Sequence, residues 1–410
     1  MLRLVVVNQR KLIAVLLLMA FAGGLVVCTV QSRPVAAKPQ MPDVPDGKEV
    51  FRFDTFGDEQ FWTDQLRLNE VIEQALDPVT ALTLGLKVDL EALPDEVVAA
   101  LAAGAVDLTD PAVTLALLEL NAVVGVIGHV EEVKGEKQLT SVGITCALCH
   151  STVDDSEATG SPLPGIGLRR DGWPNRDLNP GAIIALSPAL KDEPELQAIY
   201  QSWGPGFYDP RFNFDGVNDP VVIPPAFGLA GVDKATYTAE GPISYWNQYV
   251  AVTQMGGHGS FADPRLRIEI IQEPDLVAPK LAALAEYQLS LTTPPPPAGS
   301  FDAAAARRGK KLFEGAARCA ECHTSPLYTD INKGILHDAE ETGMDPLYAT
   351  RSTTGKYRTT PLRALWQHSP YFHDGSAASL RDVVDHYNRV LRLRLNERKK
   401  TDLVEFLKSL

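Results

Sequence analysis

The chain has 410 residues, of which 45% are hydrophobic and 22% are charged, and its formal net charge is −14 at pH 7. A chain of this length can bury more than one hydrophobic core, so we expect two domains, and the composition excludes a disordered protein. The acidic balance argues against nucleic acid as a partner, because nucleic-acid binding favours a basic surface.

The first 37 residues have the pattern of a Sec-type export signal. Arg10 and Lys11 form a basic region, and residues 12–30 are an uncharged, mostly apolar run. We expect cleavage near Ala37 and a periplasmic location. The run is also long enough to span a bilayer, so an uncleaved membrane anchor is the alternative. A Pro-rich stretch then predicts an extended linker over residues 38–48.

Two helices and a strand are predicted between the linker and residue 125. Apolar residues at helical spacing favour a helix over residues 66–76, and alternation favours a short strand over residues 82–88. Asp110 as the N-cap, Pro111 at the first helical position and Gly125 as the stop favour a helix over residues 111–124.

The rest of the chain changes character twice. Residues 150–274 are rich in Gly, Pro, Asn and aromatic residues, which predicts loops wrapped around a cofactor rather than a sheet. Helical spacing then predicts helices over residues 281–291, 303–313 and 402–410. A polyproline stretch at residues 294–297 separates the first of these from the others and indicates a domain boundary.

Two segments carry the pattern Cys-X-X-Cys-His, namely Cys146-Ala147-Leu148-Cys149-His150 and Cys319-Ala320-Glu321-Cys322-His323. In this pattern the two thiols add across the vinyl groups of a haem, and the adjacent histidine ligates the iron. A redox dithiol or half a zinc site would not explain a histidine directly after both copies. Since the one other cysteine, Cys28, lies in the export signal, the sequence predicts two covalently attached haem c groups.

The expected fold is mainly α-helical, with two cytochrome c-like haem domains. We assign residues 1–37 to the signal peptide or anchor, 38–48 to the linker and 49–292 to an N-terminal haem domain. Loops and an N-terminal extension enlarge that domain. A Pro-rich linker over residues 293–300 leads to a C-terminal cytochrome c domain over residues 301–410.

The sequence after His323 resembles the bacterial di-haem cytochrome c peroxidase family. The resemblance covers residues 303–410 and rests on three segments: Tyr357-Arg358-Thr359-Thr360-Pro361-Leu362-Arg363, Pro370-Tyr371-Phe372-His373-Asp374-Gly375-Ser376 and Leu380-Arg381-Asp382-Val383-Val384-Asp385-His386-Tyr387. In typical members the last of these is a helix that carries a Met as the distal ligand of the second haem. This chain has Tyr387 at the matching position, as the MauG-type enzymes do.

Tyr387 is therefore the first choice for the distal ligand of the His323 haem. A phenolic ligand favours high-valent iron over simple electron storage. His386 is the alternative ligand, and packing of Tyr387 in the core is the other interpretation. His373 could also ligate, but the resemblance implies that it shapes the wall of the haem pocket.

The His150 haem is expected to have an open distal site. Many family members carry a second histidine after the first motif, and here none lies between His150 and His258. The resemblance, which is loose in this region, implies that Gln254 or His258 lines the distal pocket and that Trp246 relays electrons between the haems. Packing of Trp246 is the alternative role. Met255, His258 or His129 as a sixth ligand would instead close this haem.

Three functions follow from these motifs. The first is a periplasmic peroxidase that reduces hydrogen peroxide, or another small oxidant, with electrons from a small redox protein. The second is a MauG-like or rubber-oxygenase-like oxidase of an organic substrate, and the third is a non-enzymatic electron carrier. The resemblance also implies a calcium ion between the domains, for which Thr359 or Thr360 with Asn175 or Asn179 would supply oxygen donors.

Overall fold

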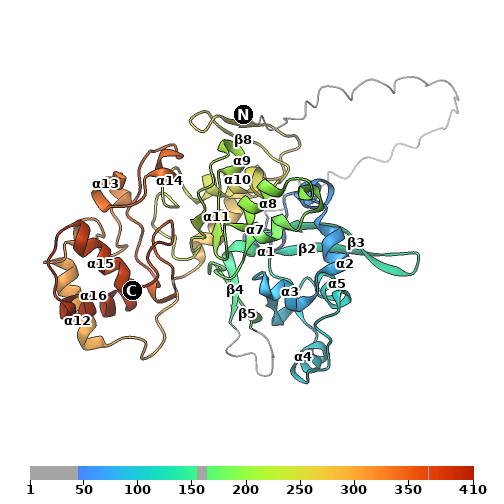
Figure 1. The fold of residues 1–410 in the computed structure, drawn as a ribbon, viewed down its shortest axis with the longest axis horizontal. Helices are drawn as coiled ribbons and strands as arrows, with labels where there is room; N and C mark the ends of the chain where they lie inside the picture. The colour runs from blue at the N-terminus through green and yellow to red at the C-terminus, as the bar shows by residue number, and fades with distance from the viewer. Residues whose placement is uncertain (1–44, 155–163, 368) are drawn as a thin grey trace, which may run out of the picture. The chain divides into compact units, whose positions relative to one another are not determined.

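The computed structural model describes residues 45–154, 164–367 and 369–410 (Figure 1). The predicted export signal, the alternative membrane anchor and most of the predicted linker lie outside these residues. Helices prevail over strands in the described chain, as expected for a mainly helical fold. Whether it comprises two cytochrome c-like domains stays a prediction, since residues 44–410 group as one compact unit.

Short helices form the N-terminal extension. They are α1 (Gly47–Phe53), the π-helix η1 (Gln60–Gln65), α2 (Leu68–Ala75), α3 (Pro78–Thr83), the 3-10 helix η2 (Leu90–Ala92), α4 (Asp95–Ala102) and α5 (Pro111–Glu119). Helix α2 agrees with the predicted helix. The predicted strand over residues 82–88 is wrong except at Val88, which begins a two-residue strand. Asp77 caps α3 through the Thr80 N–H and Pro78 begins it, so the helix continues to Thr83.

The helix capped by Asp110 begins as predicted but ends early. Helix α5 stops at Glu119, and Asn121 adopts a left-handed conformation with φ of 52°. The chain then enters β2 (Val126–Val133), which pairs antiparallel with β3 (Glu136–Ile144). Lys134 and Gly135 both have positive φ, which suits the tight turn of a two-residue hairpin. This hairpin lies against α2 and α5 and ends two residues before the first Cys-X-X-Cys-His motif.

The segment after the first motif is not only loops. Strand β4 (Ser151–Asp154) pairs with β5 (Ile166–Asp171), which also pairs in parallel with β1 (Val88–Asp89). The elements that follow are α7 (Pro180–Ala185), η3 (Pro188–Leu190), α8 (Pro194–Gln201), β6 (Phe207–Tyr208), α9 (Phe212–Asp215), β7 (Val221–Val222), α10 (Ile243–Thr253), β8 (Phe261–Asp263), β9 (Ile268–Ile270), η4 (Ala278–Lys280) and α11 (Leu281–Ser290). Helix α11 is the helix predicted over residues 281–291, whereas α10 was not predicted.

The C-terminal part packs around its two longest helices. They are α12 (Ala303–Glu314) and α16 (Glu397–Lys408), with α15 (Leu380–Val390) against α16 (Figure 1). A Cβ on Gly309 of α12 would lie 1.9 Å from the Asp402 carbonyl oxygen, so only glycine allows this approach. Shorter elements complete this part: η5 (Cys319–Glu321), η6 (Ile331–Lys333), α13 (Ala339–Thr342), α14 (Leu347–Thr350) and η7 (Leu365–Gln367).

Buried side chains gather on both sides of the Pro-rich segment. Two clusters draw their buried members from residues 50–284, and a third draws them from residues 313–407. A fourth joins Val221 to Tyr348 and Ala349. Ion pairs also join the residues before this segment to those after it, since Arg351 bonds to Asp209 at 2.9 Å and to Asp215 at 2.7 Å. The predicted domain limits therefore stay a prediction.

Candidate haem-binding site

Both Cys-X-X-Cys-His motifs line one cavity of about 950 Å³. This volume lies at the upper end of the range of roughly 300–1,000 Å³ for ligand sites. The lining is mostly aliphatic and aromatic, and it includes side chains of the N-terminal extension such as Trp62, Leu66, Ile72, Leu84 and Leu86. A large, apolar ligand would therefore be buried against residues from all parts of the described chain.

The first motif is held in place by the extension and by two sheets. Ile144, at the end of β3, donates its N–H to the carboxyl of Asp58, and the Thr145 N–H bonds to the Gly125 carbonyl at 3.0 Å. The motif forms the short helix α6 (Ala147–His150) and continues directly into β4. Hairpin and sheet thus fix the backbone on either side of His150.

The imidazole of His150 is oriented by a distant carbonyl. Its Nδ1 lies 3.1 Å from the oxygen of Pro224 and is therefore the nitrogen that donates. Burial lowers the pKa of His150 to about 4, so the ring is neutral at pH 7. A neutral ring with Nδ1–H bonded to a carbonyl leaves Nε2 available to a metal.

The second motif has the same arrangement, built locally. It follows α12 through Arg318, whose φ is 59°, and begins in the short helix η5. The Nδ1 of His323 lies 2.9 Å from the Tyr328 carbonyl oxygen, and burial lowers the pKa of this histidine as well. Two histidines far apart in sequence thus have the same hydrogen bond at Nδ1, which leaves Nε2 of each available to a metal.

The four motif cysteines suit covalent attachment to a haem. They form no disulfide, and burial raises the pKa of Cys146, Cys149 and Cys319 to about 12. Two neutral imidazoles, four thiols beside them and an apolar cavity are the groups that a c-type haem requires. The residues present therefore fit the predicted cofactor.

Tyr387 and His386 are adjacent on α15 but have different surroundings. Tyr387 lines the cavity, and its hydroxyl makes no hydrogen bond within the described residues. Burial raises the pKa of Tyr387, and its other electrostatic neighbours are Cys319 and Cys322. His386 is absent from the cavity lining, and its Nε2 lies 2.8 Å from the Thr342 carbonyl oxygen. Of the two candidate ligands, only Tyr387 therefore reaches the second motif.

His373 also lines the cavity, within a cluster of aromatic rings. Its Nε2 lies 3.0 Å from the Tyr357 hydroxyl, and its ring stacks on Tyr348 with centroids 6.0 Å apart. It is 4% exposed, and burial lowers its pKa. These contacts agree with the role of a pocket-wall residue that the resemblance implies.

The three side chains predicted for catalysis at the first haem are not all together. Gln254 lines the cavity, where its Oε1 accepts from the Tyr208 hydroxyl at 2.6 Å. Trp246 of α10 also lines it, and its indole N–H has no hydrogen-bond partner within the described chain. His258 lies away from the described cavity lining, and its Nε2 contacts the Glu273 carbonyl oxygen at 3.3 Å.

The other candidate sixth ligands of the first haem also differ in whether they line the cavity. Met255 is 4% exposed and lines the cavity, and its carbonyl accepts from the Trp62 indole N–H at 2.8 Å. His129 lies on β2 and is exposed. Among these candidates the fold brings only Met255 to the cavity.

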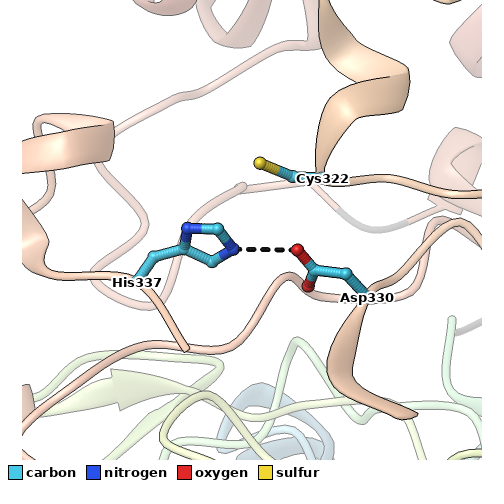
Figure 2. A group of neighbouring side chains, drawn as sticks. All are labelled: Cys322, Asp330 and His337. Carbon is cyan, nitrogen blue, oxygen red and sulfur yellow. Dashed lines mark hydrogen bonds and ion pairs between the residues drawn. The ribbon is translucent and has the colours of Figure 1, made fainter. Parts of the chain in front are cut away.

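A cluster beside the second motif was not predicted. Cys322, Asp330 and His337 place their ligand atoms within 4.8 Å of one another (Figure 2). The Nε2 of His337 contacts Asp330 at 3.0 Å, and its Nδ1 contacts Glu341 at 3.0 Å. Burial opposes the charged ring, but these two hydrogen bonds raise the pKa of His337. With Cys322 in the predicted thioether bond, Asp330 and His337 would remain, which is too few ligands for a metal, and an ion-paired imidazolium is the simpler interpretation.

The side chains predicted for calcium are only partly engaged with other groups. Asn179 caps α7 through the Ala182 N–H. Asn175 donates its amide N–H to the Gly85 carbonyl at 2.9 Å, but its Oδ1 has no hydrogen-bond partner within the described residues. The Thr359 carbonyl accepts from the Thr329 hydroxyl. Calcium therefore stays a prediction.

Sequence reasoning missed Tyr208, His337 and the arginines of the cavity lining. Tyr208 lies 46 residues before Gln254, in a segment without periodicity, so no local signal joins the two. Arg358 and Arg363 lie in the segment that resembles the peroxidase family, and the resemblance implies no role for them. Within the part of the chain that the structure describes, no helix has the length and apolar character needed to cross a membrane.

Comparisons with known proteins find relatives of part of the chain. A Methylorubrum extorquens protein named "Methylamine utilization protein MauG" is 34% identical over 123 residues, which cover 26% of this chain and 34% of that protein. The "Cytochrome c551 peroxidase" of Nitrosomonas europaea is 31% identical over 111 residues, covering 25% of this chain and 33% of that protein. A Pseudomonas "Cytochrome-c peroxidase IdrP1" is 28% identical over 148 residues, covering 25% and 39%. This chain thus matches little more than a third of these relatives' length.

Two other comparisons add little. No family model matches the chain. A MauG-like protein associated with microbial copper homeostasis has a TM-score of 0.34 at 21% identity, over 47% of this chain and 74% of that one. Hydrazine synthase of Kuenenia stuttgartiensis has a TM-score of 0.32 at 21% identity, over 47% and 73%. Such low scores carry no argument about the fold. The sequence matches alone support the conclusion that part of this chain is related to MauG and to the cytochrome c peroxidases.

Proposed function

We propose that this chain is a periplasmic di-haem c-type cytochrome that reduces hydrogen peroxide to water with electrons from a small redox protein. The observation that carries the proposal is that His150 and His323 each place Nδ1 at a backbone carbonyl oxygen, beside four thiols on one apolar cavity. The relatives named as peroxidases support the reaction class. The net charge of −14 is compatible with a basic electron donor at low salt, although solubility explains it equally well.

Haem c would supply the one-electron redox chemistry and the site at which peroxide binds. The chain's own residues would give the two haems different roles. Tyr387 supports a closed second haem, because its hydroxyl is unengaged in the described chain and it is an electrostatic neighbour of Cys319 and Cys322. Besides the two motif histidines, the described histidines of the cavity lining are His337, which is bonded to Asp330 and Glu341, and His373, which is bonded to Tyr357. These bonds support an open first haem unless Met255 ligates it.

Gln254 and Tyr208 are the polar groups best suited to act on peroxide at the open site. Gln254 accepts from the Tyr208 hydroxyl and donates its amide N–H to the Pro210 carbonyl at 2.7 Å. These two hydrogen bonds hold the pair in place at the cavity surface. Such fixed donors and acceptors can orient a peroxide by hydrogen bonds. Trp246, which is 5% exposed and lines the same cavity, is the proposed relay residue.

A MauG-like oxidation of an organic substrate is the second candidate. It is favoured by Tyr387 and by the apolar side chains that the N-terminal extension contributes to the cavity. Turnover of peroxide with a reduced small cytochrome would favour the peroxidase. Peroxide-induced spectral change without such turnover would favour the oxidase.

The test is a haem count followed by optical and EPR titration of the purified protein. We expect two covalent haems per chain, and one in the variants Cys146→Ala/Cys149→Ala and Cys319→Ala/Cys322→Ala. One high-spin and one low-spin haem would support an enzyme. Two low-spin haems that do not react with peroxide would contradict both enzymatic functions and leave the electron carrier.

A ligand test uses the neighbouring pair on α15. Tyr387→Phe should change the spectrum of the His323 haem, because it removes the only oxygen of that side chain. The matched control His386→Gln should leave the spectrum unchanged, because His386 bonds to Thr342 and not to the cavity. An unchanged spectrum in Tyr387→Phe would exclude tyrosine ligation.

A further inference from the structure

Two arginines of the cavity lining have no acidic partner within the described residues. Arg358 and Arg363 lie in the Tyr357–Arg363 segment, and the backbone of Thr360 between them is among the groups that influence the pKa of His323 in the second motif. The Nε of Arg358 is buried and has no hydrogen-bond partner in the described chain. Its Nη1 donates to the Lys234 carbonyl, which satisfies a donor but does not neutralise the charge.

The carboxylates of the described lining are engaged elsewhere. They are Asp209, Glu321 and Glu341, which bond to Arg351, Arg318 and His337 respectively. No acidic group is among those that influence the pKa of Arg358 or of Arg363, and burial lowers the pKa of both. Arg363 is among the causes that lower the pKa of Arg358, so the two charges repel each other.

Two like charges that repel each other in an apolar cavity need a counter-anion. The chain does not supply it within the described residues, so it must come with whatever occupies the cavity. A haem carries two propionate carboxylates on an otherwise apolar ring. Guanidinium groups match carboxylates with two parallel hydrogen bonds, which makes arginine well suited to this partner.

We propose that Arg358 and Arg363 bind the propionate carboxylates of haem at the part of the cavity next to the second motif. This inference rests on the proposed function, since it requires the haem. It assigns a purpose to two partly buried charges that peroxide chemistry does not need. The segment that contains them would thereby fix both the backbone near His323 and the polar edge of the cofactor.

The position of the segment leaves two sources of propionate, the His323 haem and the His150 haem. Thr360 favours the first, because its backbone is among the groups that influence the pKa of His323. Arg358 also donates its backbone N–H to Tyr237, in the half that carries the first motif. The experiment must therefore identify which haem responds.

The test uses the full-length protein carrying both haems, labelled with ¹³C at the propionate carboxyl carbons. Infrared difference spectra between the oxidised and reduced protein would be compared for the parent, Arg358→Gln and Arg363→Gln. We expect the labelled carboxylate bands to shift in both variants. Arg307→Gln, which removes an exposed arginine of α12 outside the cavity lining, is the matched control and should leave the bands unchanged.

The midpoint potentials of the two haems identify the partner. Loss of a positive charge beside the haem disfavours the reduced haem, so the reduction equilibrium constant of the bound haem should fall about tenfold, which is about 59 mV for a one-electron couple. The haem whose potential moves is the one whose propionates the arginine holds. The other haem and the Arg307→Gln variant should change by less than about twofold.

Unchanged bands and potentials in variants that hold both haems would overturn the arginine assignment alone. That outcome is also expected if the arginines bind the carboxylate of a separate ligand. Should a glutamine variant not accumulate, Arg358→Lys and Arg363→Lys replace it. They keep the charge but lose the paired hydrogen bonds, so a band shift supports the proposal and unchanged bands overturn it. Absence of covalent haem in the parent protein would refute the proposed function, and this is seen before any band is measured.

Discussion

Asp58 provides a test of how the N-terminal extension holds the first motif. Its carboxyl is 0% exposed and accepts the Ile144 N–H at the end of β3. Burial is the largest cause that raises its pKa, from 3.8 to about 9, with smaller contributions from neighbouring acids. The folded protein therefore holds this carboxyl protonated at neutral pH, whereas the unfolded chain releases the proton.

The sign of the pH dependence follows from that difference. Between about pH 4 and pH 9 the folded state binds one more proton at Asp58 than the unfolded state does, so stability falls as the pH rises. At 1.36 kcal/mol per pH unit, the cost reaches about 4 kcal/mol at pH 7 and is about 3 kcal/mol smaller at pH 5. Asp58→Asn keeps an oxygen for the Ile144 N–H and carries no charge, so it removes this cost.

The assay is chemical denaturation of the haem-loaded protein at pH 5 and pH 7. We expect Asp58→Asn to gain about 3 kcal/mol more relative to the parent at pH 7 than at pH 5. Any fixed cost of the amide is the same at both pH values and cancels. Asp64→Asn, an exposed neighbour on η1, is the control and should show no such difference. An equal effect of Asp58→Asn at both pH values would mean that Asp58 is ionised in the folded protein, contrary to the argument.

Three further predictions concern the frame of the site. The parent should lose stability as the pH rises through the raised pKa of His337, because the folded imidazolium is ion-paired below that pKa. His337→Gln should abolish this loss, which melting curves at a series of pH values would measure. A parent whose stability does not fall over this pH range would contradict the prediction. Gly125→Ala should destabilise the protein by about 2 kcal/mol or more and alter the spectrum of the first haem, since a Cβ would lie 2.1 Å from the Leu148 nitrogen. The control Gly135→Ala, where a Cβ has open space, should cost only about 1 kcal/mol in chemical denaturation. Equal costs for the two variants would refute the predicted clash with Leu148. Arg351→Met should cost about 3–5 kcal/mol in denaturation, because it leaves the buried Asp209 without its cation, and a cost below about 1 kcal/mol would show that the pair contributes little.

Local signals explain what the sequence predicted of the fold. Helices α11 and α12 were found because their apolar spacing lies within each helix, and α12 is also capped by Asp302. Helix α10 was missed because Trp246, Tyr249 and Val252 are among residues buried around most of its circumference, which removes the amphipathic pattern. It also lacks a side-chain N-cap. The alternation over residues 82–88 arose from a helix end and a turn whose leucines face the cavity and the core.

The same limit applies to the site. The two motifs are visible because their chemistry lies within five residues of sequence. The choice between Tyr387 and His386 depends on the rotation of α15, which places one beside the cavity and the other beside Thr342. The pairing of Gln254 with Tyr208 joins segments that share no pattern, so only the folded chain reveals it.

The carbonyls that orient His150 and His323 lie at very different distances along the chain. Tyr328 is five residues from His323, whereas Pro224 is 74 residues from His150. A short loop of this kind closes at little entropic cost, whereas a contact of high sequence separation must wait for most of the intervening chain to fold. During synthesis from the N-terminus, the motif that emerges first would therefore be the last to gain its oriented histidine. The second motif could acquire its orientation as soon as its own loop has been synthesised.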